Sequence, residues 1–594
     1  MEINVRSARR KFLGETIKTA AGIAGLITLA GCGEGEINAT TGHTPSPVKP
    51  TTVPDNPPSS AVLSRADLPK NVLVILTDQE RYPAHWPDGW VEKNLPSMQR
   101  LMQSGLTFTN AYTAAGQCGP SRAAMLTGQF SAVNEVSVTA DPPNSLPSQS
   151  AVASLGGILM NESDMLAIWK GKWHLTAPLT TVADPSNPVD PSNWTASDIA
   201  NLNSRYGWTG WLLPDSGTQI PSGKMSYMET AGGGIYNNDG RYVSGPTAGA
   251  VNQIQPVSGA EQQCVIDFLT NTAPKLDRPF CLVVALVNPH DVGAYPKSYS
   301  SLGYQYEDFA NLGIQPPLSY SGDNLSTKPA VHQAYARFSA QAFGGSISAQ
   351  QASDYANFYG YLHTVVDAQI GAILDALDAA NLTNDTLIIR TADHGEAGLA
   401  HGGMTEKNYT AYEEMIHIPM VISNPKLYPN PQTQAAFYDH LNFLPTILDL
   451  AGVENPNSFG NGIGRSIVPL ILGQAVSVRD SALYTYDDNF HVATSPNIPG
   501  NIRAIRQGTW MYAVYFDKQS NGSDLQYEMY DLSSDPNQIT NLLSGSPANA
   551  SSLEAAIMQQ WQKLHISLTQ QFQAAGQLAA PFISFQWPTT PWII

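Results

Sequence analysis

Charged side chains are scarce in this sequence: Asp, Glu, Lys and Arg together make up 13% of its 594 residues. An average soluble protein has about twice that share, so uncharged polar side chains must cover much of the surface. Basic residues are the scarcer kind, with 31 Lys and Arg against 49 Asp and Glu and a net charge of -18. The chain therefore lacks the broad basic face that binds nucleic acid or a polyanionic polymer. A small anionic ligand is compatible with this charge, because a buried cation and a few basic side chains can reverse the potential locally.

Cysteine is also scarce, and the four cysteines show no spacing that is typical of a metal site. Cys281 opens an apolar run and is expected to be a buried, inert thiol. Cys264 lies in a stretch with helical periodicity. A disulfide between these two is an open alternative outside the cytoplasm, but their spacing does not require one. The other two, Cys32 and Cys118, stand in motifs of their own.

The apolar run near the N-terminus, residues 19–30, is too short to span a bilayer and has the length of a signal-peptide core. An arginine pair at residues 9–10 resembles a twin-arginine signal, and the Leu-Ala-Gly before Cys32 resembles a bacterial lipobox. We therefore predict that residues 1–32 are a lipoprotein signal and that Cys32 carries a lipid. An ordinary cleaved signal is the alternative. The prediction implies an exported protein of the bacterial periplasm or cell surface, anchored to a membrane.

The rest of the chain divides into a tether and two folded parts. Residues 33–68 are rich in Pro, Thr and Ser, which predicts a disordered tether. The remainder is too long for one ordinary core, and we place a large domain at 69–474 and a smaller one at 475–594. In the smaller domain, residues 501–515 alternate like an edge strand and residues 526–532 predict another. We therefore predict an α+β domain with an antiparallel sheet, followed by an aromatic tail that packs against the protein.

Four short apolar runs in the large domain predict buried strands of a mostly parallel or mixed sheet. They cover residues 71–77, 165–169, 281–287 and 386–391. Residues 355–380 carry apolar side chains at helical spacing. Strands that are apolar throughout need cover on both faces, so we predict an α/β fold in which helices sandwich the sheet.

Polar side chains follow the ends of these four predicted strands. They are Asp78, Lys172 and His174, His290, and Asp393 with His394. In open α/β sheets, ligands bind just beyond the carboxyl ends of the strands. Taken singly, a residue of this kind is more often a cap or an ordinary loop residue. Four strand ends that converge are better evidence for a site than any single residue.

The segment from Cys118 to Gly128 reads Cys-Gly-Pro-Ser-Arg-Ala-Ala-Met-Leu-Thr-Gly. With average composition, a chance Cys-x-Pro-Ser-Arg in a chain of this length is an event on the order of one in a thousand. Pro120 suits the first position of a helix and Gly128 suits its end, so Cys118 is predicted at a helix N-terminus. The backbone amides and the dipole of a helix start favour a dianionic group.

This segment resembles the signature of the formylglycine-dependent sulfatases, in the alkaline phosphatase superfamily. Other segments resemble further landmarks of that family, at residues 171–174, 288–290, 393–396, 401–407, 443–452 and 528–542. The resemblance implies that residues 69–474 are a sulfatase catalytic domain, that 475–594 are its C-terminal subdomain, and that the chain hydrolyses sulfate monoesters. It also implies that Cys118 is oxidised to formylglycine, whose hydrate is the nucleophile, and that a formylglycine-generating enzyme is a partner.

By the same resemblance, Asp78, Asp393, His394 and the Cys118-derived hydrate would hold a divalent cation, with Gln79 as a contributor. Ligation rich in oxygen suits Ca²⁺, with Mg²⁺ or Mn²⁺ as alternatives because His394 stands where the family more often has Asn. Gln79 departs from the family, which usually has a second acid here. Its amide oxygen can bind a hard cation or orient a water molecule, but it brings no charge.

The resemblance gives roles to the remaining polar residues. Arg122 would bond the hydrate and steady the metal ligands. Lys172 and Lys407 would hold the sulfate oxygens, with Lys407 also facing the leaving oxygen. His290, its ring oriented by the aspartate that follows it, is our candidate general acid. His174 is our candidate base for the step that releases sulfate.

A phosphonate monoester or phosphodiester hydrolase is the first alternative, because Asp78-Gln79 also resembles the phosphonate hydrolases, as well as the choline sulfatases. The Lys172 and His174 pair favours a sulfatase, since the phosphorus hydrolases of this superfamily typically lack it.

The second alternative is an inactive, lipid-anchored glycan-binding protein, in which Trp208 and Trp211 stack on sugar rings. Ordinary packing of these tryptophans is at least as good an explanation. The long segment 178–257 is expected to shape the pocket, but it does not identify the ligand.

Overall fold

The computed structural model describes residues 63–84, 86–138, 152–176, 200, 203–211, 238–244, 263–488, 498–517, 525–543 and 553–576. All of them belong to one compact unit, Ala61–Ile594. The predicted signal, Cys32, residues 33–62 of the tether, the aromatic tail and most of segment 178–257 lie outside the described residues. The boundary at residue 475 stays a prediction. None of the described helices is both long enough and apolar enough to cross a membrane.

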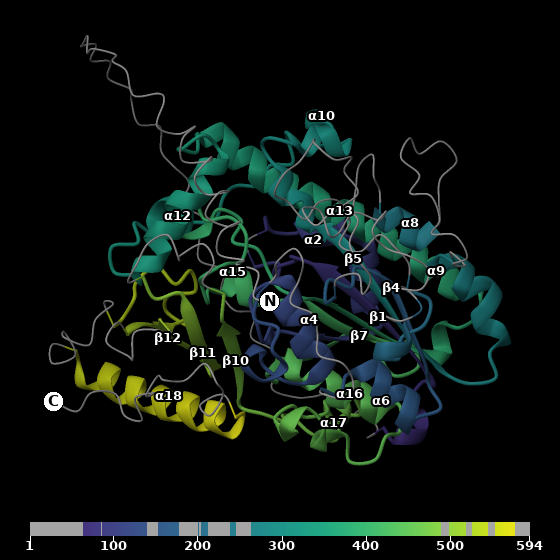
Figure 1. Cartoon of the computed structure of the whole chain (residues 1–594). Helices are drawn as coiled ribbons and strands as arrows, with labels where there is room; N and C mark the ends of the chain where they lie inside the picture. The colour runs from purple at the N-terminus through teal and green to yellow at the C-terminus, as the bar shows by residue number, and fades with distance from the viewer. Residues whose placement is uncertain are drawn as a thin grey trace, which may run out of the picture. The chain divides into compact units, whose positions relative to one another are not determined.

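A seven-stranded sheet lies at the centre of this unit (Figure 1), in the order β4-β5-β1-β6-β7-β2-β8. Its strands are β1 (Asn71–Asp78), β2 (Gly105–Phe108), β4 (Leu166–Gly171), β5 (Phe280–Pro289), β6 (Thr386–Ala392), β7 (Met420–Ser423) and β8 (Gln432–Gln434). The four predicted strands are β4, β5, β1 and β6, which are neighbours and run parallel. β7 pairs antiparallel with β6 and β2, so the sheet is mixed, as predicted.

Successive side chains of β1 enter two different hydrophobic cores. Val72, Val74 and Leu76 pack on one face of the sheet, and Leu73 and Ile75 pack on the other. The first face is covered by α4 (Cys118–Thr127), α6 (Leu155–Glu162), α16 (Phe443–Leu450) and α17 (Val468–Ile471). The second is covered by α2 (Trp90–Asn94), α3 (Pro96–Gln103) and α13 (Ala349–Ala379). Figure 1 shows these two helix layers on opposite sides of the sheet, which confirms the predicted sandwich.

The long helix α13 confirms the helix predicted over 355–380 and starts six residues earlier. Ser348 precedes it, and its side chain accepts a hydrogen bond from the backbone N–H of Gln351. The Gln351 side chain in turn accepts from the backbone N–H of Ser348. This capping box satisfies amides that the first turn of a helix cannot pair internally, and so it fixes the start of α13.

A second, four-stranded antiparallel sheet is formed by β10 (Ser481–Tyr486), β11 (Asn501–Gln507), β12 (Trp510–Phe516) and β13 (Gln526–Asp531). The helix α18 (Ala555–Ala574) packs on it through Trp561, Leu564 and Phe572. The structure confirms the predicted antiparallel sheet. The prediction of a single edge strand over residues 501–515 was wrong. The structure has a hairpin there, and its two strands are the central pair of the sheet. The turn contains Gly508, whose φ of 58° lies in the left-handed region that favours glycine.

The remaining short elements connect these layers. They are α5 (Ser131–Asn134), α8 (Asn238–Ser244), α9 (Val265–Asp267), α10 (Tyr306–Phe309), α11 (Ser319–Gly322), α12 (Ala330–Ala342), α14 (Ala400–Gly403), α15 (Glu413–Ile416), β3 (Ala111–Tyr112) and β9 (Tyr438–Asp439).

The three described cysteines, Cys118, Cys264 and Cys281, are free thiols. Cys281 lies in the core, and burial raises the pKa of its thiol to about 12, as expected for an inert cysteine. Cys264 precedes α9, and its sulfur accepts a hydrogen bond from the backbone N–H of Asp267. The alternative of a disulfide between them is therefore not realised.

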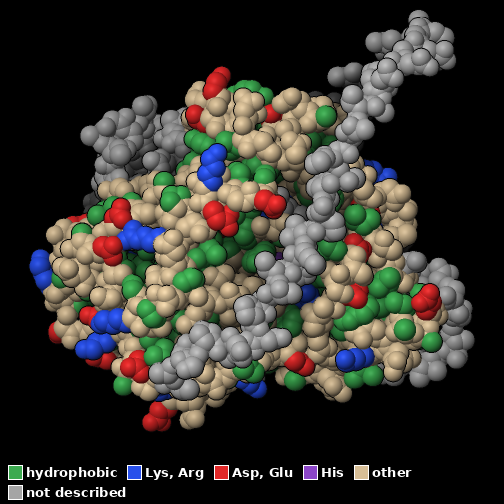
Figure 2. Space-filling view, turned by 180° about the vertical axis from the view of Figure 1, so that it is seen from behind, with side chains coloured by type: hydrophobic (Ala, Val, Ile, Leu, Met, Phe, Trp, Pro, Cys, Tyr) green, Lys and Arg blue, Asp and Glu red, His purple; other side chains and the backbone are tan. Residues whose placement is uncertain are grey.

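The surface follows the composition. On the face shown in Figure 2, acidic and basic side chains stand singly or in small groups among uncharged polar and apolar surface. This is the appearance expected of a chain with 13% charged residues.

Candidate functional site

The predicted site residues lie at the carboxyl ends of the four parallel strands. Asp78 is the last residue of β1, and Lys172 follows Gly171 at the end of β4. His290 follows β5, and Asp393 follows β6. Because these strands are parallel neighbours, their ends lie along one edge of the sheet. The polar side chains that follow the four strands therefore lie close together, as the sequence predicted.

The helix α4 brings Cys118 to this edge. The helix begins at Cys118 and ends at Thr127, and Gly128 follows with a φ of 65°. Every residue of α4 is buried. Pro120 occupies the third helical position rather than the first, and a proline is tolerated there because the first-turn amides have no partner within the helix. The prediction of Cys118 at a helix start is confirmed.

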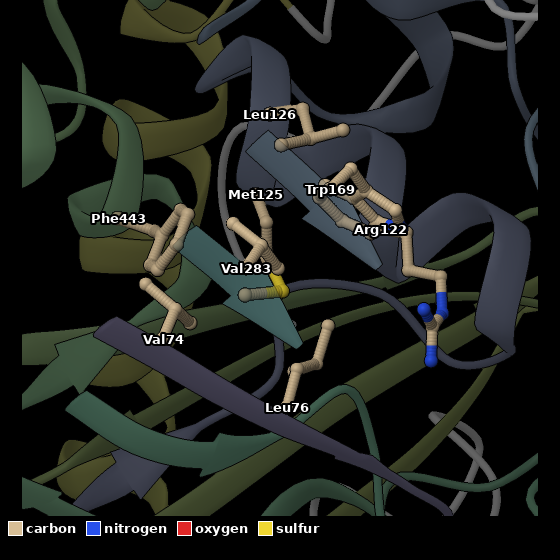
Figure 3. Close-up of a pocket in the computed structure, with 8 residues that line it drawn as sticks. All are labelled: Val74, Leu76, Arg122, Met125, Leu126, Trp169, Val283 and Phe443. Carbon is tan, nitrogen blue, oxygen red and sulfur yellow. The ribbon is translucent and has the colours of Figure 1, made fainter. Parts of the chain in front are cut away.

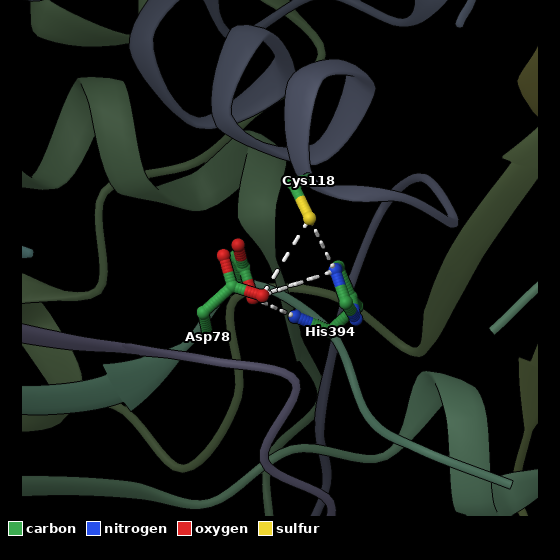
Figure 4. Close-up of side chains that lie close together, drawn as sticks. Asp78, Cys118 and His394 are labelled. Atoms are coloured by element: carbon green, nitrogen blue, oxygen red, sulfur yellow. Dashed lines mark hydrogen bonds and ion pairs between the residues drawn. The ribbon is translucent and has the colours of Figure 1, made fainter. Parts of the chain in front are cut away.

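Four buried side chains form a group that can hold a cation: Asp78, Cys118, Asp393 and His394. One potential ligand atom from each lies within 4.8 Å of all the others. Figure 4 shows the Cys118 sulfur, the Asp78 carboxylate and the His394 ring pointing toward one another. Cys118 Sγ lies 3.2 Å from His394 Nε2 and 3.5 Å from Asp78 Oδ1. Two carboxylates suit a hard divalent cation, and an imidazole nitrogen is a common ligand of divalent transition metals, so these residues fit a bound divalent cation.

Arg122 joins the two carboxylates of this group from one side. Its Nε donates to Asp393 Oδ2 at 2.9 Å, and one Nη donates to Asp78 Oδ2 at 3.1 Å. The other Nη donates to the backbone carbonyl of Lys172 at 2.7 Å. All three side chains are fully buried. The planar guanidinium therefore fixes the ends of β1 and β6 and the residue after β4 in one geometry.

Lys172 places a positive charge beside Cys118. Its ammonium lies 2.7 Å from Asp78 Oδ2 and 3.5 Å from Cys118 Sγ. Burial opposes ionisation of Asp78, but Lys172, His290 and Arg122 outweigh it and hold the pKa of Asp78 well below its usual range. Burial and Asp78 likewise oppose a thiolate at Cys118, yet Lys172, Lys407 and His394 lower the pKa of the thiol well below its usual value. The position of Cys118 thus favours an anionic group.

The pKa of Asp393 is shifted in the opposite direction from that of Asp78. Burial and the nearby Asp78 carboxylate raise its pKa to about 6, against the effect of His394 and Arg122. Two carboxylates this close repel each other when both are ionised. A cation between them would remove that cost.

Gln79, Lys407 and His290 form a second group next to the first. The Lys407 ammonium lies 2.7 Å from Gln79 Oε1, 3.2 Å from His290 Nε2 and 2.9 Å from Glu406 Oε2. Gln79 Nε2 donates to Glu396 Oε2 at 2.6 Å. Here the Gln79 amide therefore bridges Lys407 and Glu396, and its role as a metal contributor stays a prediction. Lys407 is held at the site rather than being a solvated loop lysine.

His290 Nε2 lies beside the Lys407 ammonium. Burial, Lys407 and Lys172 oppose its protonation, but Asp78 and a hydrogen bond with Cys118 outweigh them and raise its pKa to about 10. The aspartate that was expected to orient the ring, Asp291, accepts a hydrogen bond from Tyr304 Oη at 2.6 Å.

His174 is buried at the same edge of the sheet, with a φ of 56°. Its predicted role as a base stays a prediction.

Two residues near the site were not predicted from the sequence. Asp239, in α8, accepts hydrogen bonds from the backbone N–H groups of Val287 and Asn288 at 2.7 and 2.9 Å, and so holds the end of β5 that leads into His290. Gln117 precedes Cys118 and donates to side chains from two distant segments. Neither has a local signal, because both roles depend on contacts between segments far apart in the chain.

A small cavity of about 10 Å³ lies behind Arg122, inside the apolar core (Figure 3). It is lined by Val74, Leu76, Arg122, Met125, Leu126, Trp169, Val283 and Phe443. A single water molecule needs about this much room, so the cavity cannot hold a substrate.

Trp208 and Trp211, which the glycan-binding alternative would place against sugars, are 2% and 1% exposed. Trp208 packs edge-on against Trp169, with ring centroids 5.2 Å apart, and Trp211 Nε1 donates to the backbone carbonyl of Gly171 at 3.1 Å. These tryptophans are packing residues, as the plainer explanation held.

Comparison with known proteins gives two family matches. The family model described as Sulfatase matches residues 70–453. The model described as N-sulphoglucosamine sulphohydrolase, C-terminal, matches residues 401–567.

Three curated relatives align over most of the chain. Arylsulfatase K of Bos taurus is 23% identical, over 83% of this chain and 82% of that protein. The choline-sulfatase of Rhizobium meliloti is 25% identical, over 80% of this chain and 82% of that protein. The ulvan-active sulfatase of Formosa agariphila is 25% identical, over 80% of this chain and 77% of that protein.

Solved structures share the fold. A 2-O GAG sulfatase superimposes with a TM-score of 0.58 at 18% identity, over 85% of this chain and 92% of that one. The phosphonate monoester hydrolase of Silicibacter pomeroyi gives 0.58 at 22% identity, over 86% of this chain and 97% of that one. Both the sulfur and the phosphorus hydrolases thus share this architecture, so substrate choice has to be argued from the site.

Proposed function

This chain belongs to the sulfatase family, and we propose that it hydrolyses sulfate monoesters at the strand-end site built around Cys118. The observation that carries the proposal is the position of Cys118, at a buried helix start between the Lys172 ammonium and the Asp78–Asp393–His394 group. A sulfate group needs positive charge around its oxygens and a nucleophile close to its sulfur. The residues around Cys118 can provide both.

We propose that Cys118 is converted to formylglycine and that Asp78, Asp393 and His394 hold a divalent cation with it, Ca²⁺ by preference and Mg²⁺ or Mn²⁺ as alternatives. When bound, the cation supplies positive charge to an anionic nucleophile and to the sulfate, and the hydrated formylglycine supplies a hydroxyl as that nucleophile. The low pKa of the Cys118 thiol supports this proposal, because it reports an environment that stabilises negative charge at this side chain.

The chain's own cations bind the sulfate. Lys172 reaches Cys118 and Asp78 from β4, and Lys407 lies on the side of His290. Arg122 is committed to Asp78 and Asp393, so it orients the carboxylates rather than the substrate. We assign Lys172 and Lys407 to the sulfate oxygens, with Lys407 nearest the leaving oxygen.

His290 Nε2 lies 3.2 Å from the Lys407 ammonium, and the pKa of His290 is raised to about 10, so the ring can carry a proton at the site. We assign His290 as the general acid that donates a proton from Nε2 to the departing alcohol or phenol oxygen. His174 is the proposed base that accepts a proton when sulfate is released.

The substrate class is proposed from relatives. One relative is described as ulvan-active, and a solved structure of the same fold is described as a complex with D-glucosamine-2-N,6-O-disulfate. These descriptions support a sulfated carbohydrate as the substrate of this chain.

The test compares three 4-nitrophenyl esters, a sulfate, a phosphonate and a phosphodiester, on protein purified from a host that has a formylglycine-generating enzyme. We expect kcat/KM for the sulfate to exceed that for either phosphorus ester by about tenfold or more. A large preference for a phosphorus ester would overturn the proposal and favour the hydrolase class to which Asp78-Gln79 also points.

Cys118→Ala is expected to abolish turnover of the aryl sulfate, because the nucleophile is lost. The control is the mass of the tryptic peptide that carries residue 118, which should show formylglycine in the wild type and alanine in the variant. Full activity in protein whose Cys118 is an unmodified thiol would contradict the assignment.

Removal of the metal with a chelator is expected to abolish activity and to lower the Tm, because Asp78 and Asp393 are left to repel each other. Return of Ca²⁺, Mg²⁺ or Mn²⁺ in separate samples should restore the Tm, and the ion that does so at the lowest concentration identifies the preferred metal. An unchanged Tm and activity after chelation would argue against a bound cation.

We also propose that the chain is exported and anchored through a lipid on Cys32, on the support of its lipobox-like sequence. The variant Cys32→Ala should move the protein from the membrane fraction to the soluble fraction. Recovery of both forms in the soluble fraction would contradict the anchor.

A further inference from the structure

Gln117, the residue before Cys118, has an unusual backbone conformation. Its φ is 106° and its ψ is 151°. The other eleven described non-glycine residues with positive φ have values between 49° and 69°, in the ordinary left-handed region. The region that Gln117 occupies is populated almost only by glycine, because a Cβ crowds the backbone there. A glutamine keeps this conformation only if its surroundings hold it.

The side chain of Gln117 is held by two distant segments. Its Nε2 lies 2.7 Å from Asn408 Oδ1, 3.1 Å from Tyr486 Oη and 3.0 Å from Asp488 Oδ2. Tyr486 ends β10 of the second sheet, Asp488 follows it, and Asn408 is the neighbour of Lys407. Gln117 is 5% exposed as a whole residue, so these hydrogen bonds are largely shielded from competing water.

The chain just before Gln117 is pressed against the same strand. The backbone N–H of Gly116 donates to the carbonyl of Thr485 in β10 at 3.2 Å. A Cβ on Gly116 would lie 2.1 Å from Tyr484 Oη. The segment that precedes Cys118 is thus held against β10 by the backbone of Gly116 and by the side-chain amide of Gln117.

We propose that Gln117 is a positioning residue for the nucleophile, and this inference rests on the proposed function. Its amide links the residue before Cys118 to the residue after Lys407, and it offsets the cost of the strained backbone. The hydrogen bonds of the Gln117 amide set the direction of the backbone at Cys118 and the distance between Cys118 and Lys407. Without the amide, the peptide before Cys118 relaxes to a common conformation and turns the nucleophile away from the sulfate.

The test compares Gln117→Ala with Gln117→Gly, which both lack the amide and differ only in the Cβ. We expect kcat for an aryl sulfate to fall by about tenfold or more in the Ala variant, because misplacement of a reacting group by about 1 Å can cost that much or more. The fall should be smaller in the Gly variant, since glycine can keep the backbone conformation, and KM should change far less than kcat in both. We also expect the Gly variant to have the higher Tm, the reverse of the usual order for Ala and Gly. Rates are divided by the fraction of chains that carry formylglycine, measured by mass spectrometry.

Gln538 is the matched control, because it is also a buried glutamine with positive φ, and its side chain accepts a hydrogen bond from the backbone N–H of Glu413 at 2.7 Å rather than from a residue of the site. Gln538→Ala should lower the Tm and leave kcat unchanged. If the Gln117 variants do not fold, the double variant Tyr486→Phe with Asp488→Ala removes two of the three acceptors, so that one of the two amide hydrogens loses its partner, and it should lower kcat with little change in KM.

A kcat close to the wild-type value in Gln117→Ala, or in the double variant at residues 486 and 488 where that one is used, would overturn the inference. So would a higher Tm for the Ala variant than for the Gly variant. Wild-type protein that carries formylglycine but does not cleave sulfate esters would instead refute the proposed function, and the Tm comparison would still test the strain at Gln117.

Discussion

Arg122 forms hydrogen bonds with residues at the ends of three strands of the site. Its three groups of hydrogen bonds join α4 to the ends of β1 and β6 and to the residue after β4. All the charges involved are fully buried. A buried ion pair adds little net stability, but the loss of one partner is costly because the other charge is left without compensation.

Arg122→Lys is therefore expected to lower the free energy of unfolding by about 3 kcal/mol, since one ammonium cannot reach both carboxylates and the carbonyl. Urea denaturation of the metal-depleted protein measures the loss. The control is Arg100→Lys, because Arg100 pairs with Asp375 and Asp378 at the exposed surface. That change should cost less than about 1 kcal/mol. Equal effects of the two substitutions would refute the special role of Arg122.

At the scale of elements, the end of β4 depends on Gly171. Its φ is 92°, and a Cβ on it would lie 2.1 Å from the carbonyl oxygen of Ala285 in β5. No larger residue fits between the two strands without moving one of them. Gly171 thus lets the chain turn directly into Lys172.

Gly171→Ala is expected to destabilise the protein by more than about 2 kcal/mol and to lower kcat/KM, because β4 must move and carries Lys172 with it. The control is Gly473→Ala, where φ is 66° but nothing lies within 4 Å of the new Cβ. That variant reports the backbone strain alone, about 1 kcal/mol. Thermal unfolding and aryl sulfate turnover distinguish the two, and a Gly171 variant no worse than the control would contradict the steric argument.

The elements also show what the sequence can and cannot predict. The ends of β4, β5, β1 and β6 were predictable, because fully apolar runs mark buried parallel strands and parallel strands share an edge. The hairpin at β11 and β12 was missed because alternation continues across its turn, and Gly508 was the only local signal. The hydrogen bonds of the Gln117 amide and of the Asp239 carboxylate could not be predicted, because their partners come from segments far apart in the chain that only the packed fold brings together.

At the scale of the whole molecule, a buried polar network joins α12 to the second sheet. His332 in α12 contacts Tyr515 Oη of β12 at 3.1 Å and Tyr412 Oη at 2.9 Å. Glu528 of β13 lies 3.7 Å from the same ring. Burial lowers the pKa of His332 to about 4, despite Glu528 and with the help of Lys328.

This histidine predicts a loss of stability in acid. Its pKa in the folded state lies below the value of 6.5 in the unfolded chain, so the unfolded chain takes up the proton first as the pH falls. Stability is unaffected above about pH 6.5 and falls between there and about pH 4, by about 3 kcal/mol at most. His332→Gln should reduce that fall, as measured by urea unfolding at several pH values. Parallel pH curves for the two proteins would contradict the prediction.

The burial of Cys118 limits when this side chain can be modified. The thiol is 0% exposed, and the whole helix behind it is enclosed. If Cys118 is converted to formylglycine, as proposed above, the enzyme that oxidises it therefore has to reach the side chain before the chain has folded. Under that proposal, oxidation and folding compete during the same interval, and a chain that folds first keeps a thiol where the proposed hydroxyl nucleophile would form.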